Sequence, residues 1–143
     1  MMKEQRIDTA TLTVSAKGTL PRVPFARIKN AILGEDYELS VVFLPPTAAR
    51  ALNITHRGKD YVPNTLSFPL TTTSGEIILC RSAARAQYKT FGMTYDDYLT
   101  FLLIHSALHL KGYAHGSTME RKEKEFLQLF STSNGKITHQ RRH

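Results

Sequence analysis

Residues 105–115 of this 143-residue chain read His-Ser-Ala-Leu-His-Leu-Lys-Gly-Tyr-Ala-His. On an α-helix, His105 and His109 lie about 40° apart and one turn along the axis, so both imidazoles can reach one ion. Gly112 can adopt the left-handed conformation that turns a chain sharply after a helix, which brings His115 back toward them. Three neutral imidazoles with an open fourth position are typical of a catalytic zinc site. We therefore expect these three histidines to hold one Zn²⁺ at the end of a long helix.

The spacing His-x3-His-x2-Gly-x2-His reproduces that of the metzincin metalloproteases, with one residue of their motif missing. Ser106 replaces the glutamate that follows their first histidine, and no acid occurs between Asp97 and Glu120. Zinc peptidases use that glutamate as the general base on the bound water, a role that serine cannot take near neutral pH. Peptide hydrolysis by this route is therefore disfavoured. A metal-bound water with a pKa near ~7 can still attack without a carboxylate base.

The composition is that of one small globular domain with a basic excess. Hydrophobic residues make up 41% and charged residues 22%, which excludes disorder as the main state. Nineteen Lys+Arg against twelve Asp+Glu give a net charge of +7, which favours a polyanionic partner, either nucleic acid or an anionic membrane surface. No apolar run is long enough to span a bilayer, and the N-terminus lacks the apolar segment of a signal peptide. The single cysteine, Cys80, fits a reducing cytoplasm and a buried apolar position.

Hydrophobic periodicity predicts an α+β fold with a small mixed sheet of about four strands packed with helices. The strands are expected over residues 10–15, 38–44, 66–69 and 76–79. Pro69 cannot donate a ladder hydrogen bond, which places the third of these at an edge of the sheet.

Five helices are predicted from capping and stop signals. The first is opened by Pro21 and Pro24 and stops at Gly34, and a short second helix is capped by Thr47 and ends near Gly58. The third covers residues 82–91. A long fourth helix is capped by Thr94 and ends near Lys111, and the fifth covers residues 117–130. We expect residues 1–130 to form a single domain and residues 131–143 to form a basic, disordered tail.

The histidine segment resembles the zinc motif of the YbeY family, bacterial endoribonucleases involved in ribosomal RNA maturation, whose pattern is His-Gly-x-Leu-His-Leu-x-Gly-Tyr-Asp-His. A second block, Leu52-Asn53 followed by residues 57–61 and 64–69, resembles the family's Leu-Asn-x3-Arg-x2-Asp and Thr-Asp/Asn-Val-Leu-Ser-Phe-Pro. The similarity runs from about residue 37 to residue 130. Ser106 and Ala114 stand where the family has glycine and aspartate.

This resemblance implies a zinc-dependent, single-strand-specific endoribonuclease that acts in ribosomal RNA maturation and ribosome quality control. A metal-bound water would attack an RNA phosphodiester, with zinc on His105, His109 and His115. Arg57 matches the family's functional arginine, and a guanidinium near zinc can grip a phosphate. The implied partners are ribosomal RNA and the ribosome or its proteins, with no membrane. A non-catalytic ribosome-associated RNA-binding factor with a structural metal, and a protease, remain alternatives.

Other basic residues suggest an RNA-binding face. Arg81, Arg85 and Lys89 recur every four residues, and no acid occurs between residues 76 and 96, so they can share a helical face that follows an RNA backbone. A solvated face explains them nearly as well. Ser67, on the predicted edge strand, is expected to line the substrate groove, and Phe68 to line it or to enter the core. The remaining histidines are expected at the surface: His56, His139 and His143.

Overall fold

The sheet of the computed structural model, which describes residues 4–132, has five strands in the order β1-β2-β3-β5-β4. Strands β2 and β3 pair in parallel, as do β3 and β5, whereas the two outer pairs, β1 with β2 and β4 with β5, are antiparallel. The predicted α+β fold with a mixed sheet is therefore confirmed. The strands are β1 (Glu4–Asp8), β2 (Leu12–Lys17), β3 (Glu38–Phe43), β4 (Thr65–Thr71) and β5 (Ser74–Leu79).

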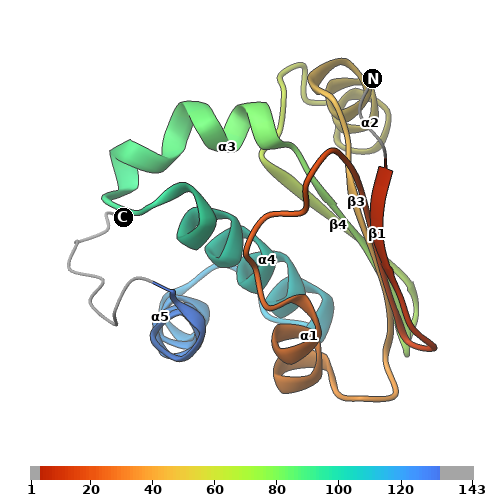
Figure 1. Ribbon diagram of the computed structural model, residues 1–143, viewed down its shortest axis with the longest axis vertical. Coiled ribbons are helices and arrows are strands. Elements are labelled where there is room, and N and C mark those ends of the chain that lie inside the picture. Colours follow the sequence, from red (N-terminus) through yellow and green to blue (C-terminus); the bar gives the residue numbers. More distant parts are fainter. Residues whose placement is uncertain (1–3, 133–143) are drawn as a thin grey trace.

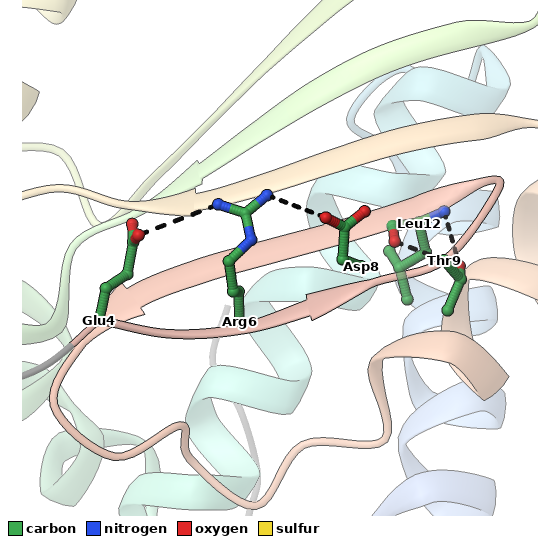
Figure 2. Close-up of polar contacts among 5 residues, drawn as sticks. All are labelled: Glu4, Arg6, Asp8, Thr9 and Leu12. Atoms are coloured by element: carbon green, nitrogen blue, oxygen red, sulfur yellow. Dashed lines mark hydrogen bonds and ion pairs between the residues drawn. The ribbon is translucent and has the colours of Figure 1, made fainter.

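Strand β1 was not among the expected strands, because its sequence is mostly charged and lacks an apolar alternation. Residues at i and i+2 lie on one face of a strand, and here Arg6 lies between Glu4 and Asp8, at 3.9 and 3.5 Å (Figure 2). The turn into β2 is closed by Thr9, whose hydroxyl exchanges hydrogen bonds with the backbone of Leu12. A charged edge strand of this kind discourages pairing with another chain.

Strand β4 forms the opposite edge of the sheet, as Pro69 predicted. The register shifts between Pro69 and Thr71, where a bulge accommodates the missing ladder donor. This edge strand carries Thr65, Ser67 and Phe68 beside the histidine helix, since α4 packs against β4.

The helices are α1 (Phe25–Leu33), α2 (Pro46–Arg57), α3 (Arg81–Gln87), a 3-10 turn η1 (Tyr88–Phe91), α4 (Tyr95–Lys111) and α5 (Ser117–Phe130). Helices α1 and α4 lie against one face of the sheet, and α5 packs on α4 (Figure 1). Two local expectations were wrong. Helix α2 begins at Pro46 after an extended Pro45, without a side-chain cap from Thr47. Residues 82–91 do not form one helix, because α3 gives way to η1 after Gln87.

Helix α4 is the centre of the molecule and positions the histidine segment. Leu99, Leu103, Ile104 and Leu108 on this helix are at most 1% exposed. They pack with the inward side chains of β2, β3 and β5 into one core cluster. A helix that is apolar on most of its circumference must be buried, so α4 is fixed on several sides and its C-terminal turn is held rigidly.

The N-terminus of α4 is closed by two sets of hydrogen bonds. Thr94 Oγ1 accepts from the Asp97 N–H at 3.1 Å, which confirms the predicted cap. The buried Asp97 carboxylate accepts from the Ser131 hydroxyl at 2.9 Å and from the Thr132 N–H at 2.9 Å. The first two residues of the expected tail are therefore held against the domain. Residues 133–143, where disorder and two surface histidines were predicted, lie outside the described residues.

Candidate metal centre

Three histidine side chains converge at the C-terminal end of α4. His105 and His109 lie one turn apart on the helix, and His115 follows it in the loop before α5. One ligand nitrogen from each residue lies within 4.8 Å of the other two. The ring centroids are 4.6 Å apart for His105 with His109, 5.3 Å for His105 with His115 and 4.6 Å for His109 with His115.

Gly112 makes this convergence possible. It ends α4 with φ of 117° and ψ of 3°, the left-handed conformation that the sequence predicted. The N–H of Gly112 donates to the carbonyls of Leu108 and His109, and the N–H of Tyr113 donates to Leu108 at 3.0 Å. These bonds satisfy the last carbonyls of the helix, so the loop leaves at a fixed angle and His115 reaches the helical pair.

Glu123 on α5 lies behind His105. Its Oε2 is 2.5 Å from His105 Nδ1, and its side chain is 8% exposed. A carboxylate on the outer nitrogen of an imidazole fixes the tautomer and the orientation of the ring, and such partners are typical of metal-ligating histidines. Sequence reasoning missed this residue, although an acid on the apolar face of α5 between Met119 and Leu127 is a signal that could have identified it.

His109 is oriented by the backbone. Its Nδ1 lies 3.0 Å from the Tyr113 carbonyl, to which the ring N–H can donate. Burial, with a further contribution from the neighbouring His105, lowers the pKa of His109 below its usual value. The neutral imidazole is the form that binds a metal. Both helical histidines therefore have Nδ1 engaged and offer Nε2 to the centre.

The donor set fits a divalent metal ion. Three imidazole nitrogens in mutual reach, two of them with an engaged outer nitrogen, match the first and second coordination shells of a three-histidine site. His105 and His109 are half-buried, whereas His115 is exposed, so one side of the centre is open to a substrate. Imidazole suits zinc, and it also suits copper, iron and nickel.

Ser106, the residue in place of the peptidase glutamate, is buried and contacts strand β4. It is 1% exposed, and its hydroxyl lies 2.7 Å from the hydroxyl of Thr65 on β4. The Ser106 side chain therefore ties α4 to the edge strand. Cys80 is also buried, at 1% exposure, as expected for a small apolar side chain.

A groove of about 560 Å³ opens beside the histidines and contains two of the residues predicted from the sequence. Arg57 and Ser67 line it together with all three histidines. Phe68 is half-buried in its wall rather than in the core, with its ring 5.0 Å from that of the exposed His56. The other lining residues are Tyr61, Asn64, Thr65, Leu66 and Ser106.

Arg57 is held in the groove by Asn53, one turn earlier on α2. Arg57 Nη1 donates to Asn53 Oδ1 at 3.2 Å, and Asn53 is fully buried. Its other amide atom, Nδ2, donates to the carbonyl of Tyr61 at 3.0 Å. Sequence reasoning did not assign a role to Asn53, and its position one helical turn before Arg57 is the signal that points to it.

The predicted basic stripe does not reach the groove. Arg81 donates to the carbonyl of Thr19 and lies 5.0 Å over the ring of Phe43. Arg85 lies over Tyr95 at 5.0 Å. Lys89 belongs to η1 rather than to α3, so the three side chains do not repeat along one α-helix. None of them lines the groove.

A larger cavity of about 1010 Å³ adjoins the centre between α4, α5 and η1, and it shares Asn64, His105 and His115 with the groove. Its apolar wall includes Phe91, Tyr98, Phe101 and Leu102, and its charged residues include Glu120, Arg121 and Lys124.

In the described residues, no helix has the length and apolar character needed to cross a bilayer.

The fold and the site together define an α+β protein with an open three-histidine metal centre beside an arginine-containing groove. The family model described as endoribonuclease YbeY matches residues 4–131. The chain therefore belongs to the YbeY family, as the two sequence blocks predicted.

Individual relatives show the same similarity. Proteins described as endoribonuclease YbeY are 39% identical in Bdellovibrio bacteriovorus, 33% in Paraburkholderia phymatum and 31% in Albidiferax ferrireducens. These matches cover 65%, 78% and 82% of this chain. They cover 61%, 76% and 85% of the respective relatives. A solution structure from Thermotoga maritima is 25% identical with a TM-score of 0.54, over 73% of this chain and 77% of that one.

Proposed function

We propose that this chain is a zinc-dependent endoribonuclease that hydrolyses phosphodiester bonds of single-stranded RNA in the cytoplasm. We also propose that it acts in ribosomal RNA maturation and ribosome quality control, with the ribosome or its proteins as partners, and its membership of the YbeY family supports this. The observation that carries the proposal is the groove in which Arg57 and Ser67 lie with His105, His109 and His115. An arginine beside imidazoles that can bind a metal suits a phosphodiester, because the guanidinium and the bound metal ion would both attract the anionic phosphate.

When bound, a Zn²⁺ ion polarises a phosphoryl oxygen and lowers the pKa of a coordinated water. The protein's part is to hold His105, His109 and His115 in one orientation. Glu123 holds His105 through Nδ1, and the Tyr113 carbonyl holds His109 in the same way. These partners keep Nε2 of each helical histidine unprotonated and directed at the centre.

Arg57 is placed to bind the phosphate. One of its N–H groups is used by Asn53, which leaves the remaining donors for phosphate oxygens. A guanidinium that is oriented before the substrate arrives stabilises charge that develops on these oxygens without reorganising. The Ser67 hydroxyl lines the same groove and can donate to a second phosphate oxygen or to a ribose hydroxyl.

The charge of the groove favours RNA over a peptide. Among its described lining residues there is no aspartate or glutamate. A peptidase of the usual kind needs a carboxylate beside the metal, and the buried Glu123 is already engaged with His105. The groove therefore lacks both the peptidase base and the negative charge that would repel a phosphate.

The direct test is a paired assay of RNA and casein cleavage with the zinc-loaded protein, before and after treatment with a chelator. The proposal predicts RNA cleavage that stops with chelation and returns with Zn²⁺, and no casein cleavage. Zinc-loaded protein that binds ribosomal RNA without cutting it would contradict the proposal and support a non-catalytic RNA-binding factor.

A further inference from the structure

Tyr61 is an exposed aromatic residue in the wall of the groove. Four large hydrophobic residues are exposed within the described part of the chain: Ile54, Tyr61, Leu70 and Leu129. Tyr61 is the aromatic one among them, it is 50% exposed, and it alone of the four lines the groove with the histidines. An exposed aromatic ring in the wall of this groove is accessible to a ligand that binds beside the histidines.

The backbone of Tyr61 and the guanidinium of Arg57 are linked through one buried side chain. Asn53, at 0% exposure, donates from Nδ2 to the Tyr61 carbonyl and accepts at Oδ1 from Arg57. The neighbouring Asp60 is held by Arg50 at 2.6 Å, which fixes the loop a second time. The position of the Tyr61 backbone relative to Arg57 is therefore set before any ligand arrives.

We propose that Tyr61 stacks on an unpaired RNA base adjacent to the phosphate that Arg57 binds. The proposal rests on the function proposed above, because it assigns a base subsite to the same groove. His56 and Phe68, whose rings meet at 5.0 Å, form the adjoining wall and supply further aromatic surface. A phosphate-binding cation next to an exposed ring matches the two parts of a nucleotide, its charge and its flat base.

This subsite selects unpaired RNA without reading sequence. Every base has a π-face, so stacking on a tyrosine tolerates all four. In a duplex both faces of each base are covered by its neighbours, and sequence-tolerant recognition by aromatic stacking requires bases that can be splayed out. Tyr61 thus supplies a physical reason for a single-strand preference, which a metal and an arginine alone do not provide.

The test measures stacking directly with a 2-aminopurine base in a single-stranded RNA oligonucleotide, whose fluorescence is quenched by stacking on an aromatic ring. Zinc-loaded wild-type protein and the variants Tyr61→Phe, Tyr61→Leu and Ile54→Ala are mixed with it in a stopped-flow instrument, so that binding is read before cleavage, and gels of the quenched mixtures verify that the oligonucleotide is still intact. Removal of one stacking ring is expected to raise the Kd about 5- to 100-fold. Tyr61→Leu should show this loss and lose the quenching, whereas Tyr61→Phe, which keeps the ring, should retain both.

Ile54→Ala is the matched control, because Ile54 is a similarly exposed apolar residue on α2 that does not line the groove. Tyr61→Leu protein that quenches and binds like the wild type overturns the proposal. So does an equal loss of affinity for the same oligonucleotide in a duplex, which would indicate a structural role. Wild-type protein that stacks the base but never cuts RNA contradicts the proposed nuclease alone. Cleavage with an unchanged KM in Tyr61→Leu contradicts the base subsite alone.

Discussion

Glu123 Oε2 and His105 Nδ1 lie 2.5 Å apart, although the two residues are 18 positions apart on different helices. This contact joins α5 to the metal centre through a buried carboxylate. It supplies an orienting partner for a metal-ligating imidazole, a function that the chain does not obtain from position 114, where alanine stands and is exposed. The second helix of the candidate site therefore takes part in orienting one of the three histidines that could hold a metal ion.

Replacement of Glu123 by glutamine should weaken metal binding. The amide keeps the volume but lacks the negative charge that holds the His105 N–H, and loss of such a partner costs about 10- to 100-fold in affinity or activity. Zinc affinity is measured by competition with a chelating dye. Glu125→Gln is the control, because Glu125 is exposed and its ion pair with Lys122 is 3.9 Å long. Equal zinc affinity in Glu123→Gln and wild type would contradict the role of this carboxylate.

Replacement of Arg57 by alanine should lower kcat/KM for RNA by about 100-fold or more, since a preorganised donor to developing charge is lost. The zinc content should stay at the wild-type level, because Arg57 contacts Asn53 and not the histidines. Arg57→Lys should be intermediate, since an ammonium lacks the planar fork that binds two phosphate oxygens. Arg22→Ala, an exposed arginine outside both cavities, is the control for charge. Unchanged cleavage by Arg57→Ala would remove this residue from the mechanism.

Replacement of Asp97 by asparagine should lower the free energy of unfolding by about 1–3 kcal/mol. The buried carboxylate accepts several hydrogen bonds with both oxygens, whereas the NH₂ group of the asparagine amide can only donate. The partners of the carboxylate include the Ser131 hydroxyl and the N–H and hydroxyl of Thr132. The measurement is urea unfolding. Asp96→Asn removes the same charge from the same helical turn and is the matched control. Equal unfolding midpoints for the two variants would show that the contacts with residues 131 and 132 contribute nothing.

Lys29 should make stability depend on pH in the alkaline range. Its Nζ donates to Thr11, Asn30 and the Glu35 carbonyl, and burial lowers its pKa below 10.5 although Asp36 and Glu35 oppose the shift. Between the lowered pKa and 10.5 the unfolded chain binds more protons than the folded one, so the free energy of unfolding rises with pH. Subtraction of Lys29→Met unfolding energies from those of the wild type isolates this contribution. The difference should grow as pH rises toward 10.5. A constant or falling difference would contradict a lowered pKa of Lys29 in the folded protein.

The metal centre illustrates what the sequence could predict. Three ligands within eleven residues follow from helix geometry and from one glycine, so the convergence of His105, His109 and His115 was foreseeable from residues 105–115 alone. Glu123 and Asn53 were harder to assign. Their roles depend on how α5 packs against α4 and on how the loop after α2 returns, and neither is a local property of the chain.

The fold shows the same division between local and tertiary signals. The long central helix, its Thr94 cap and the edge position of β4 follow from capping, apolar run length and Pro69. Strand β1 was missed because its ladder with β2 forms despite a charged sequence, and pairing with a neighbour overrides the weak local preference. Arg81, Arg85 and Lys89 do not lie on one continuous α-helix, because helix α3 ends at Gln87, where the chain tightens into a 3-10 turn before Gly92.

The most direct test of the central claim compares RNA cleavage and bound zinc in the wild type and in His109→Ala, with circular dichroism to verify that both are folded. We expect the folded variant to bind no zinc and to leave a single-stranded ribosomal RNA fragment intact, whereas the zinc-loaded wild type should cut it and should stop when the metal is chelated. Cleavage at the wild-type rate by folded, zinc-free His109→Ala would contradict a metal-dependent nuclease centred on these three histidines.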